Sequence, residues 1–78
     1  MNVQFYSRPN CSLCVEGLKM LKLVQEDIDF NIEVINIEED DALHEKFMVM
    51  IPVVEYNSNI IQYGIIDYPT LLEALSEV

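Results

Sequence analysis

Positively charged side chains are scarce in this sequence. Its 78 residues include 4 lysine and arginine residues against 14 aspartate and glutamate residues, which gives a net charge of −10 at neutral pH. Binding to a nucleic-acid backbone or to an anionic membrane surface depends on clustered cations, which this chain cannot assemble. The sequence therefore predicts that neither nucleic acid nor a membrane is a partner. We interpret the excess of acids as a solvated surface that keeps the protein soluble.

Long hydrophobic runs are also missing. The longest apolar run extends from Met48 to Val54 and is interrupted by Pro52. It falls far short of the roughly 20 residues that a membrane-spanning helix needs. The N-terminal residues, Met1-Asn2-Val3-Gln4, lack the basic and apolar regions of a secretory signal. We therefore expect a cytoplasmic protein.

The length of the chain limits it to one small domain, predicted over residues 1–78. Hydrophobic residues make up 51% of the composition, enough apolar material for a folded core. No repeat, low-complexity tract or linker divides the chain. We expect this domain to be a monomer.

Hydrophobic periodicity predicts the element order β-α-β-α-β-β-α. Strands are predicted over residues 2–6, 30–37, 50–56 and 60–63, with a hairpin loop at Asn57-Ser58-Asn59. Helices are predicted over residues 12–26, after the acidic run 38–41, and after Asp67, which can cap the last helix. Strand 30–37 has apolar residues on both faces, which predicts a parallel strand covered on both sides. The sum is an α/β fold: a small mixed sheet with helices on both faces.

Gly17 lies on the apolar stripe of the first predicted helix, together with Cys14, Leu18 and Leu21. A glycine inside a helix costs about 1 kcal/mol relative to alanine. We therefore expect Gly17 to allow a close approach between this helix and the sheet.

Both cysteines lie in the segment Cys11-Ser12-Leu13-Cys14, between the first predicted strand and the first predicted helix. In this context a C-x-x-C sequence is typical of a redox-active pair. At the helix N-terminus, free N–H groups and the helix dipole stabilise a thiolate, and Arg8 adds a positive charge three residues upstream. Both effects lower the pKa of the Cys11 thiol. Cys14, one turn further along, is predicted to be less exposed and to resolve the intermediate.

Other interpretations of the pair stay open at this point. A metal site would need two further ligands, and the chain offers only His44 and carboxylates. A metal or cluster binder would therefore need two chains that share their C-x-x-C pairs. A catalytically silent module that binds a protein partner is the remaining alternative. Buried inert cysteines explain Cys14 but do not explain Cys11 in a polar turn.

The segments Tyr6-Ser7-Arg8-Pro9-Asn10-Cys11-Ser12-Leu13-Cys14 and Ile51-Pro52-Val53, with Gly64 and Asp67, resemble the glutaredoxin branch of the thioredoxin superfamily. The resemblance covers nearly the whole chain and implies a thioredoxin-like fold, with a four-stranded sheet in the order 2-1-3-4. It also implies a cis peptide bond between Ile51 and Pro52 that faces the cysteines. In this family the backbone before the cis-proline pairs with a bound peptide or with glutathione, which assigns that role to Ile51. Arg8 matches a basic position of the family, and Gly64 and Asp67 match its glutathione-binding positions.

The chain departs from the glutaredoxin pattern in two places. Ser12-Leu13 stand between the cysteines, where glutaredoxins usually have Pro-Tyr or Pro-Phe, and Tyr63 replaces the first glycine of a pair. Met48 is predicted to fill the core, with a soft surface for partner proteins as the alternative. Strand packing explains Tyr6 and Tyr63, although either could flank the cysteines.

The predicted function is that of a thiol–disulfide oxidoreductase. The Cys11 thiolate attacks a disulfide of a protein or of glutathione, and Cys14 releases the reduced product. No metal or organic cofactor is expected, and glutathione is a candidate reductant. The predicted substrate-binding residues are Arg8, Ile51, Pro52, Gly64 and Asp67.

Overall fold

The computed structural model describes residues 1–77 and contains the predicted elements in the predicted order. These elements are β1 (Asn2–Ser7), α1 (Ser12–Gln25), β2 (Asn31–Asn36), the short 3-10 helix η1 (Ile37–Glu39), α2 (Asp41–Phe47), β3 (Val53–Tyr56), β4 (Asn59–Tyr63) and α3 (Tyr68–Ser76). Only η1 was not predicted, and it connects β2 to α2. Within residues 1–77, no helix has the length and apolar character needed to cross a bilayer.

The four strands form one mixed sheet in the order β2-β1-β3-β4, as the resemblance implied. β1 and β2 run parallel, with Ser7 opposite Asn36. β3 is antiparallel to both of its neighbours, so that its first residue, Val53, lies opposite Tyr6 of β1 and Tyr63 of β4. The end of β1, the start of β3 and the end of β4 therefore lie at the same end of the sheet.

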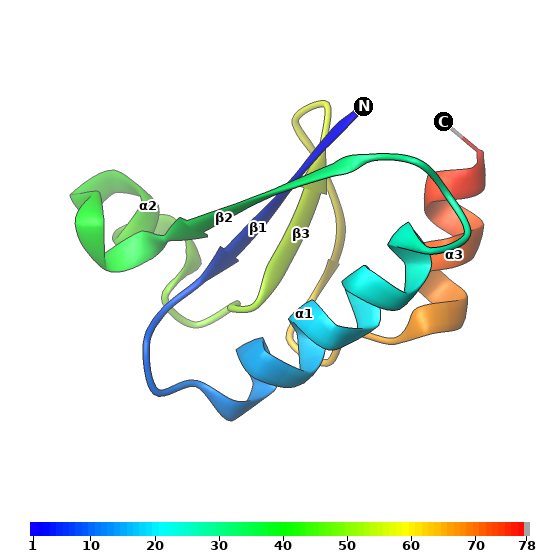
Figure 1. Cartoon of the computed structure of the whole chain (residues 1–78). Coiled ribbons are helices and arrows are strands. Elements are labelled where there is room, and N and C mark those ends of the chain that lie inside the picture. Colours follow the sequence, from blue (N-terminus) through cyan, green and yellow to red (C-terminus); the bar gives the residue numbers. More distant parts are fainter. Residues whose placement is uncertain (78) are drawn as a thin grey trace.

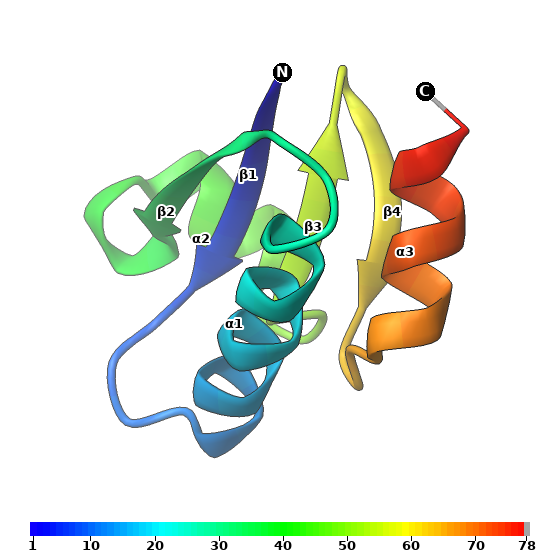
Figure 2. The ribbon, with the colours of Figure 1, turned by 45° about the vertical axis from the view of Figure 1, so that its right-hand side comes forward.

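Helices cover both faces of the sheet, as predicted. Figures 1 and 2 show α1 and α3 on one face and α2 on the other. Consecutive residues of a strand point to opposite faces, so Phe5 enters the core under α1 and α3 whereas Tyr6 enters the core under α2. The buried residues of the larger core are Val3, Phe5, Leu21, Val24, Phe30, Val54, Ile66, Leu71 and Leu75. Those of the smaller core are Tyr6, Ile37, Phe47 and Val53.

β2 is an edge strand, and the prediction that both of its faces are covered is wrong. No residue from Asn31 to Asn36 is buried, and Val34 is 54% exposed. The buried apolar residues of this region flank the strand, because Phe30 precedes it and Ile37 follows it. Since β2 has β1 as its one neighbour in the sheet, its side chains reach only the margins of the two cores.

The hairpin between β3 and β4 is one residue shorter than predicted. Asn57 and Ser58 form its loop, with φ angles of 52° and 66°, and Asn59 already pairs with Tyr56. Two successive residues with positive φ are typical of a type I′ turn, whose twist matches that of the flanking strands.

Gly17 lies on the buried side of α1, where the helix packs closely over the sheet, as predicted. A Cβ atom at this position would lie 3.0 Å from Cγ1 of Ile66, 3.1 Å from Cγ of Pro52 and 3.3 Å from Cζ of Phe5. Any larger residue would therefore have to displace atoms that belong to the core or to the start of β3.

Candidate active site

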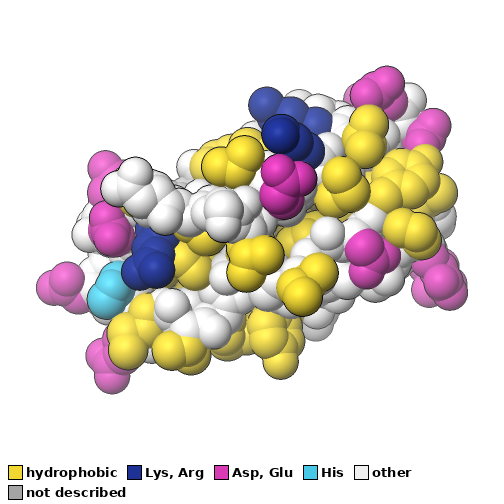
Figure 3. Space-filling model, turned by 90° about the horizontal axis from the view of Figure 1, so that it is seen from below, with side chains coloured by type: hydrophobic (Ala, Val, Ile, Leu, Met, Phe, Trp, Pro, Cys, Tyr) yellow, Lys and Arg dark blue, Asp and Glu magenta, His cyan; other side chains and the backbone are white. Residues whose placement is uncertain are grey.

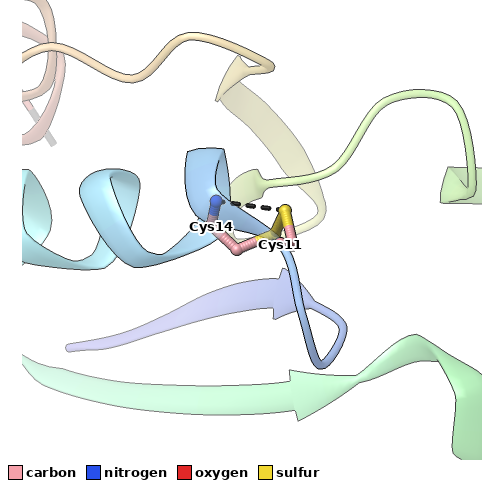
Figure 4. The surroundings of a disulfide bond; sticks show 2 residues. All are labelled: Cys11 and Cys14. Atoms are coloured by element: carbon pink, nitrogen blue, oxygen red, sulfur yellow. Dashed lines mark hydrogen bonds between the residues drawn. A yellow bond between two sulfur atoms is a disulfide. The ribbon is translucent and has the colours of Figure 1, made fainter.

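The two cysteines lie at the beginning of α1. Cys11 is the N-cap residue of this helix, and Cys14 belongs to its first turn. Their side chains form a disulfide, with the two Cα atoms 5.2 Å apart (Figure 4). Cys11 is partly exposed whereas Cys14 is only 5% exposed, which confirms the predicted difference in accessibility. A molecule that approaches from solvent therefore meets Cys11 first.

The sulfur of Cys11 also caps the helix. Its Sγ accepts a hydrogen bond from the N–H of Cys14 at 3.1 Å, drawn as the dashed line in Figure 4. The backbone of Cys11 is extended, with φ −121° and ψ 105°, as is usual for an N-cap residue. Sulfur thus takes the role that a hydroxyl or carboxylate oxygen commonly has. Because the first N–H groups of a helix lack intrahelical partners, this position stabilises negative charge on the sulfur once the disulfide is reduced.

Ile51 and Pro52 lie directly before β3, at the end of the sheet where β1 also ends. The peptide bond between them is cis, as the resemblance implied. Pro52 is buried, and its ring packs against α1 at Gly17, one turn after Cys14. The carbonyl oxygen of Pro52 accepts a hydrogen bond from the N–H of Gly64 at 2.8 Å. The fold therefore brings Pro52 and Gly64 together, close to the helix turn that carries the cysteines.

Gly64 follows β4 and has a φ of 76°. A Cβ atom here would meet no atom within 4 Å, so the requirement for glycine comes from the backbone and not from crowding. Glycine adopts this left-handed conformation without the steric cost that other residues bear. Gly64 thus turns the chain from β4 toward α3, and its N–H donates a hydrogen bond to the carbonyl oxygen of Pro52.

Asp67 is the N-cap residue of α3, as predicted. One carboxylate oxygen accepts a hydrogen bond from the N–H of Thr70 at 2.9 Å, and the other accepts one from Nε2 of Gln62 at 2.9 Å. The N–H of Asp67 in turn donates to Oε1 of Gln62 at 3.0 Å. The hydrogen bond from Thr70, followed by that from Gln62, lowers the pKa of Asp67. Sequence reasoning missed Gln62, because its position in β4 gave no sign that its amide reaches the next helix.

Arg8 lies in the connection between β1 and α1 and is exposed. The ion pair found within residues 1–77 joins Lys19 to Glu16 and does not involve Arg8. A role of Arg8 beside Cys11 therefore stays a prediction.

Exposed apolar side chains lie in the segments at the end of the sheet where β1 ends and β3 begins, and we call them the apolar rim. Val49 is 87% exposed, Ile65 76% and Tyr63 57%, and the remaining two members are about half exposed. The five members are Leu13, Met48, Val49, Tyr63 and Ile65. Figure 3 views the lower end of the molecule in Figure 1 and shows hydrophobic side chains spread across it. The prediction that Met48 fills the core is wrong, and Tyr63 is not explained by strand packing alone.

Tyr6 differs from Tyr63 because it is buried, on the face of the sheet that α2 covers. Its hydroxyl donates a hydrogen bond to Glu55 at 2.9 Å, and its ring centroid lies 4.6 Å from that of Phe47. Burial and the hydrogen bond to Glu55 raise the pKa of Tyr6 to about 12. Tyr6 is therefore a packing residue, as expected from its strand.

Metal-ligating side chains do not cluster in the part of the chain that the structure describes. No group of three or more histidine, cysteine, aspartate or glutamate side chains gathers within residues 1–77.

The sheet order, with a cysteine pair at the start of α1 and a cis-proline before β3, defines a thioredoxin-like α/β fold. A structural genomics target protein from X. campestris has this fold, with a TM-score of 0.81, 22% identity and 97% of both chains covered. Thioredoxin 1 from Thermosipho africanus has it as well, with a TM-score of 0.62, 20% identity, 99% of this chain covered and 97% of that chain. So does thioredoxin-2, a component of the malaria parasite protein secretion machinery, with a TM-score of 0.70, 13% identity, and coverages of 99% and 82%. At these identities the likeness is evidence of the fold.

The family follows from the sequence itself. Residues 2–76 match the model of the glutaredoxin-like domain (DUF836), and the chain belongs to this family. No curated protein matches the chain. The resemblance inferred from the residues around the cysteines and the cis-proline is thereby confirmed.

Proposed function

We propose that this protein is a thiol–disulfide oxidoreductase that reduces disulfides of protein substrates. The observation that carries the proposal is the place of Cys11. Its sulfur is the accessible member of a disulfide and also the cap of a 14-residue helix. A reduced Cys11 in this position combines exposure with stabilisation of the thiolate, the two properties that a nucleophilic thiol needs.

The reaction begins with the reduced pair. The Cys11 thiolate attacks one sulfur of the substrate disulfide, the substrate S–S bond breaks, and the second substrate sulfur leaves as a thiolate that takes up a proton. Cys14 then loses its proton and attacks Sγ of Cys11. This step forms the Cys11–Cys14 disulfide and releases the first substrate sulfur as a thiol. Two electrons have passed from the pair to the substrate.

Protein disulfides suit this site better than glutathione disulfide. Glutathione carries two carboxylates and one ammonium group, so its binding depends on charged partners and free N–H groups. Here the N–H of Gly64 and both carboxylate oxygens of Asp67 already have partners within the protein. Of the four cations in the chain, Arg8 alone lies in the segments 7–14, 48–52 and 63–67 that form the site. The apolar rim instead offers a surface that a protein can cover.

The oxidised pair needs two electrons from outside to act again. Glutathione or an enzyme of the thioredoxin-reductase type is the proposed reductant, and no metal or organic cofactor is part of the proposal. A reducing compartment such as the cytoplasm favours this direction of the reaction. We propose that the protein acts there as a monomer, with Arg8 and the carbonyl oxygen of Ile51 in contact with the substrate, because the N–H of Ile51 already donates to the carbonyl oxygen of Phe47.

Two single variants test the assignment of the sulfurs. Cys11→Ser is expected to abolish reduction of a protein disulfide such as those of insulin, because the attacking sulfur is gone. Cys14→Ser is expected to accumulate a mixed disulfide through Cys11, seen by mass spectrometry as an adduct that a reductant removes. A Cys11→Ser protein that reduces insulin at the parent rate would refute the assignment.

The silent module and the shared metal centre predict other results. A silent binding module would show no conversion between dithiol and disulfide when equilibrated across glutathione buffers of cytosolic potential. A centre shared by two chains would appear as metal in the purified, reduced protein and as a dimer in solution.

A further inference from the structure

Gly17 is the position at which the helix that carries the cysteines packs against Pro52. It lies three residues after Cys14, so both are on the buried face of α1. The three atoms that a Cβ at Gly17 would crowd belong to Ile66, Pro52 and Phe5, at 3.0, 3.1 and 3.3 Å. Ordinary van der Waals contact between carbon atoms begins at about 3.5 Å. A side chain at position 17 would therefore be crowded against Pro52 and its neighbours, and these atoms or the helix would have to move by a few tenths of an ångström.

The segment on the other side of this contact is held in place. The N–H groups of Met50 and Ile51 both donate to the carbonyl oxygen of Phe47, at 2.8 and 3.1 Å. The carbonyl oxygen of Pro52 accepts the N–H of Gly64 at 2.8 Å. Because hydrogen bonds fix the segment before and after the cis bond, a methyl group at position 17 would displace the first turns of α1 more readily than it would displace Pro52.

We propose that Gly17 is a positioning residue, which sets the spacing between the cysteine pair and the Ile51–Pro52 segment. The inference rests on the proposed function, because this spacing matters only if a substrate lies between the two. A methyl group would move Cys11 and Cys14 together, by a few tenths of an ångström, away from the backbone of Ile51. The hydrogen bond between Cys14 and Sγ of Cys11 lies inside one helical turn and would move with them.

The inference separates two properties that an ordinary packing defect would change together. The spacing controls how well a bound protein disulfide is aligned for attack, and a misplacement of about 1 Å can cost a hundredfold in rate. The ionisation of Cys11 depends on amides of its own helix turn, which the shift leaves intact. Gly17→Ala should therefore slow the reaction and leave the thiol titration unchanged.

The test compares Gly17→Ala with the parent in insulin reduction. We expect kcat/KM to fall on the order of tenfold, since the shift is a fraction of an ångström. The rate of Cys11 alkylation by iodoacetamide, followed across pH on the reduced proteins, should give superimposable profiles. Lys22→Ala, at an exposed position of the same helix, is the matched control and should behave as the parent in both assays.

A second substitution separates the contact with Ile66 from the contact with Pro52. Ile66→Ala removes the nearest crowded atom and leaves Pro52 at 3.1 Å, so Gly17→Ala/Ile66→Ala should still be slower than Ile66→Ala alone. The double variant also serves if Gly17→Ala by itself fails to fold, because its methyl group enters the vacated space. A double variant that is as fast as Ile66→Ala would overturn the inference, because the effect would then come from Ile66 and not from the contact with Pro52.

Three further results are decisive. A Gly17→Ala protein with the parent rate would overturn the positioning role and leave the proposed function intact. A rate loss with a parallel shift of the alkylation profile would also overturn it, because the effect would then lie in the thiol itself. A parent protein that does not reduce insulin would overturn the proposed function, and the positioning role with it.

Discussion

The apolar rim makes a quantitative prediction about how the protein binds its substrates. Val49 and Ile65 are its most exposed members and lie in two different connections, one after α2 and one after β4. We consider the double substitution Val49→Ser/Ile65→Ser. Because neither side chain is part of a core, the change should leave the free energy of unfolding within about 0.5 kcal/mol of the parent value.

The expected effect on binding follows from the exposed fractions. Complete burial of an aliphatic side chain of this size contributes about 1.5–3 kcal/mol. Val49 and Ile65 expose 87% and 76% of their surface. If a docked protein covers half of what each residue exposes, the two together contribute about 2 kcal/mol. Since about 1.4 kcal/mol corresponds to a factor of ten, KM for a protein disulfide should rise roughly 25-fold.

The assay measures reduction of two substrates by each variant. Insulin is large enough to cover the rim, whereas hydroxyethyl disulfide is too small to reach it. We expect KM for insulin to rise in Val49→Ser/Ile65→Ser while the rate with hydroxyethyl disulfide stays unchanged. Val34→Ser is the matched control, because Val34 is 54% exposed on β2, outside the rim.

Two results would contradict this reasoning. If both substrates slow down equally, the substitutions have damaged the reactive sulfur and the rim is not a binding surface. If insulin is reduced at the parent KM, protein substrates dock elsewhere, and the preference for protein disulfides over glutathione loses its main support.

Two further predictions concern the turn and the helix cap that follow β4. Gly64→Ala should lower the free energy of unfolding by about 1–2 kcal/mol in urea denaturation, because alanine is strained at a φ of 76°. The surrounding space is open, so backbone strain is the whole effect. A loss well above this range would reveal a steric clash. Asp67→Ala should be less stable than the parent at neutral pH, and the difference should shrink in acid. The folded pKa of Asp67 lies below the ordinary value of 3.8, so its contribution is complete above pH 3.8 and disappears as the pH falls through the lower folded value. A difference that persists unchanged at pH 2 would show that the carboxylate charge is not involved.

The sequence was sufficient to predict the helices and strands and the position of the cysteine pair, because these depend on local signals, whereas the sheet order came from the family resemblance. Alternating apolar residues identified β1, a helical stripe identified α1, and the C-x-x-C segment between them indicated the chemistry. The predicted close approach at Gly17 is also confirmed. It was predictable because a glycine in a helix lowers stability, and a close neighbour that leaves no room for a side chain explains its presence on a buried stripe. The cis bond before Pro52 was accessible only through the family resemblance, because few X–Pro bonds are cis.

Features that depend on distant neighbours could not be predicted in the same way. The apolar pattern of β2 predicted a strand covered on both faces, but the cover that a strand at the sheet edge receives depends on how far the helices extend over it. The bonds between Gln62 and Asp67 join a strand to the following helix through side chains, and no periodicity reports them. The exposure of Met48 and Tyr63 likewise depends on the segments that fail to cover them, which the residues themselves do not encode.

The strongly acidic composition opposes the negative charge that Cys11 must carry if it acts as the proposed nucleophile. A net charge of −10 opposes the formation of a thiolate, yet no acidic residue occurs before Glu16. Exposed charges more than about 8 Å away are largely screened at physiological ionic strength. The N–H of Cys14 lies only 3.1 Å from Sγ of Cys11 and acts without such screening. We therefore expect the reactivity of reduced Cys11 to depend more on the cap geometry than on added salt, which alkylation rates at two ionic strengths would check.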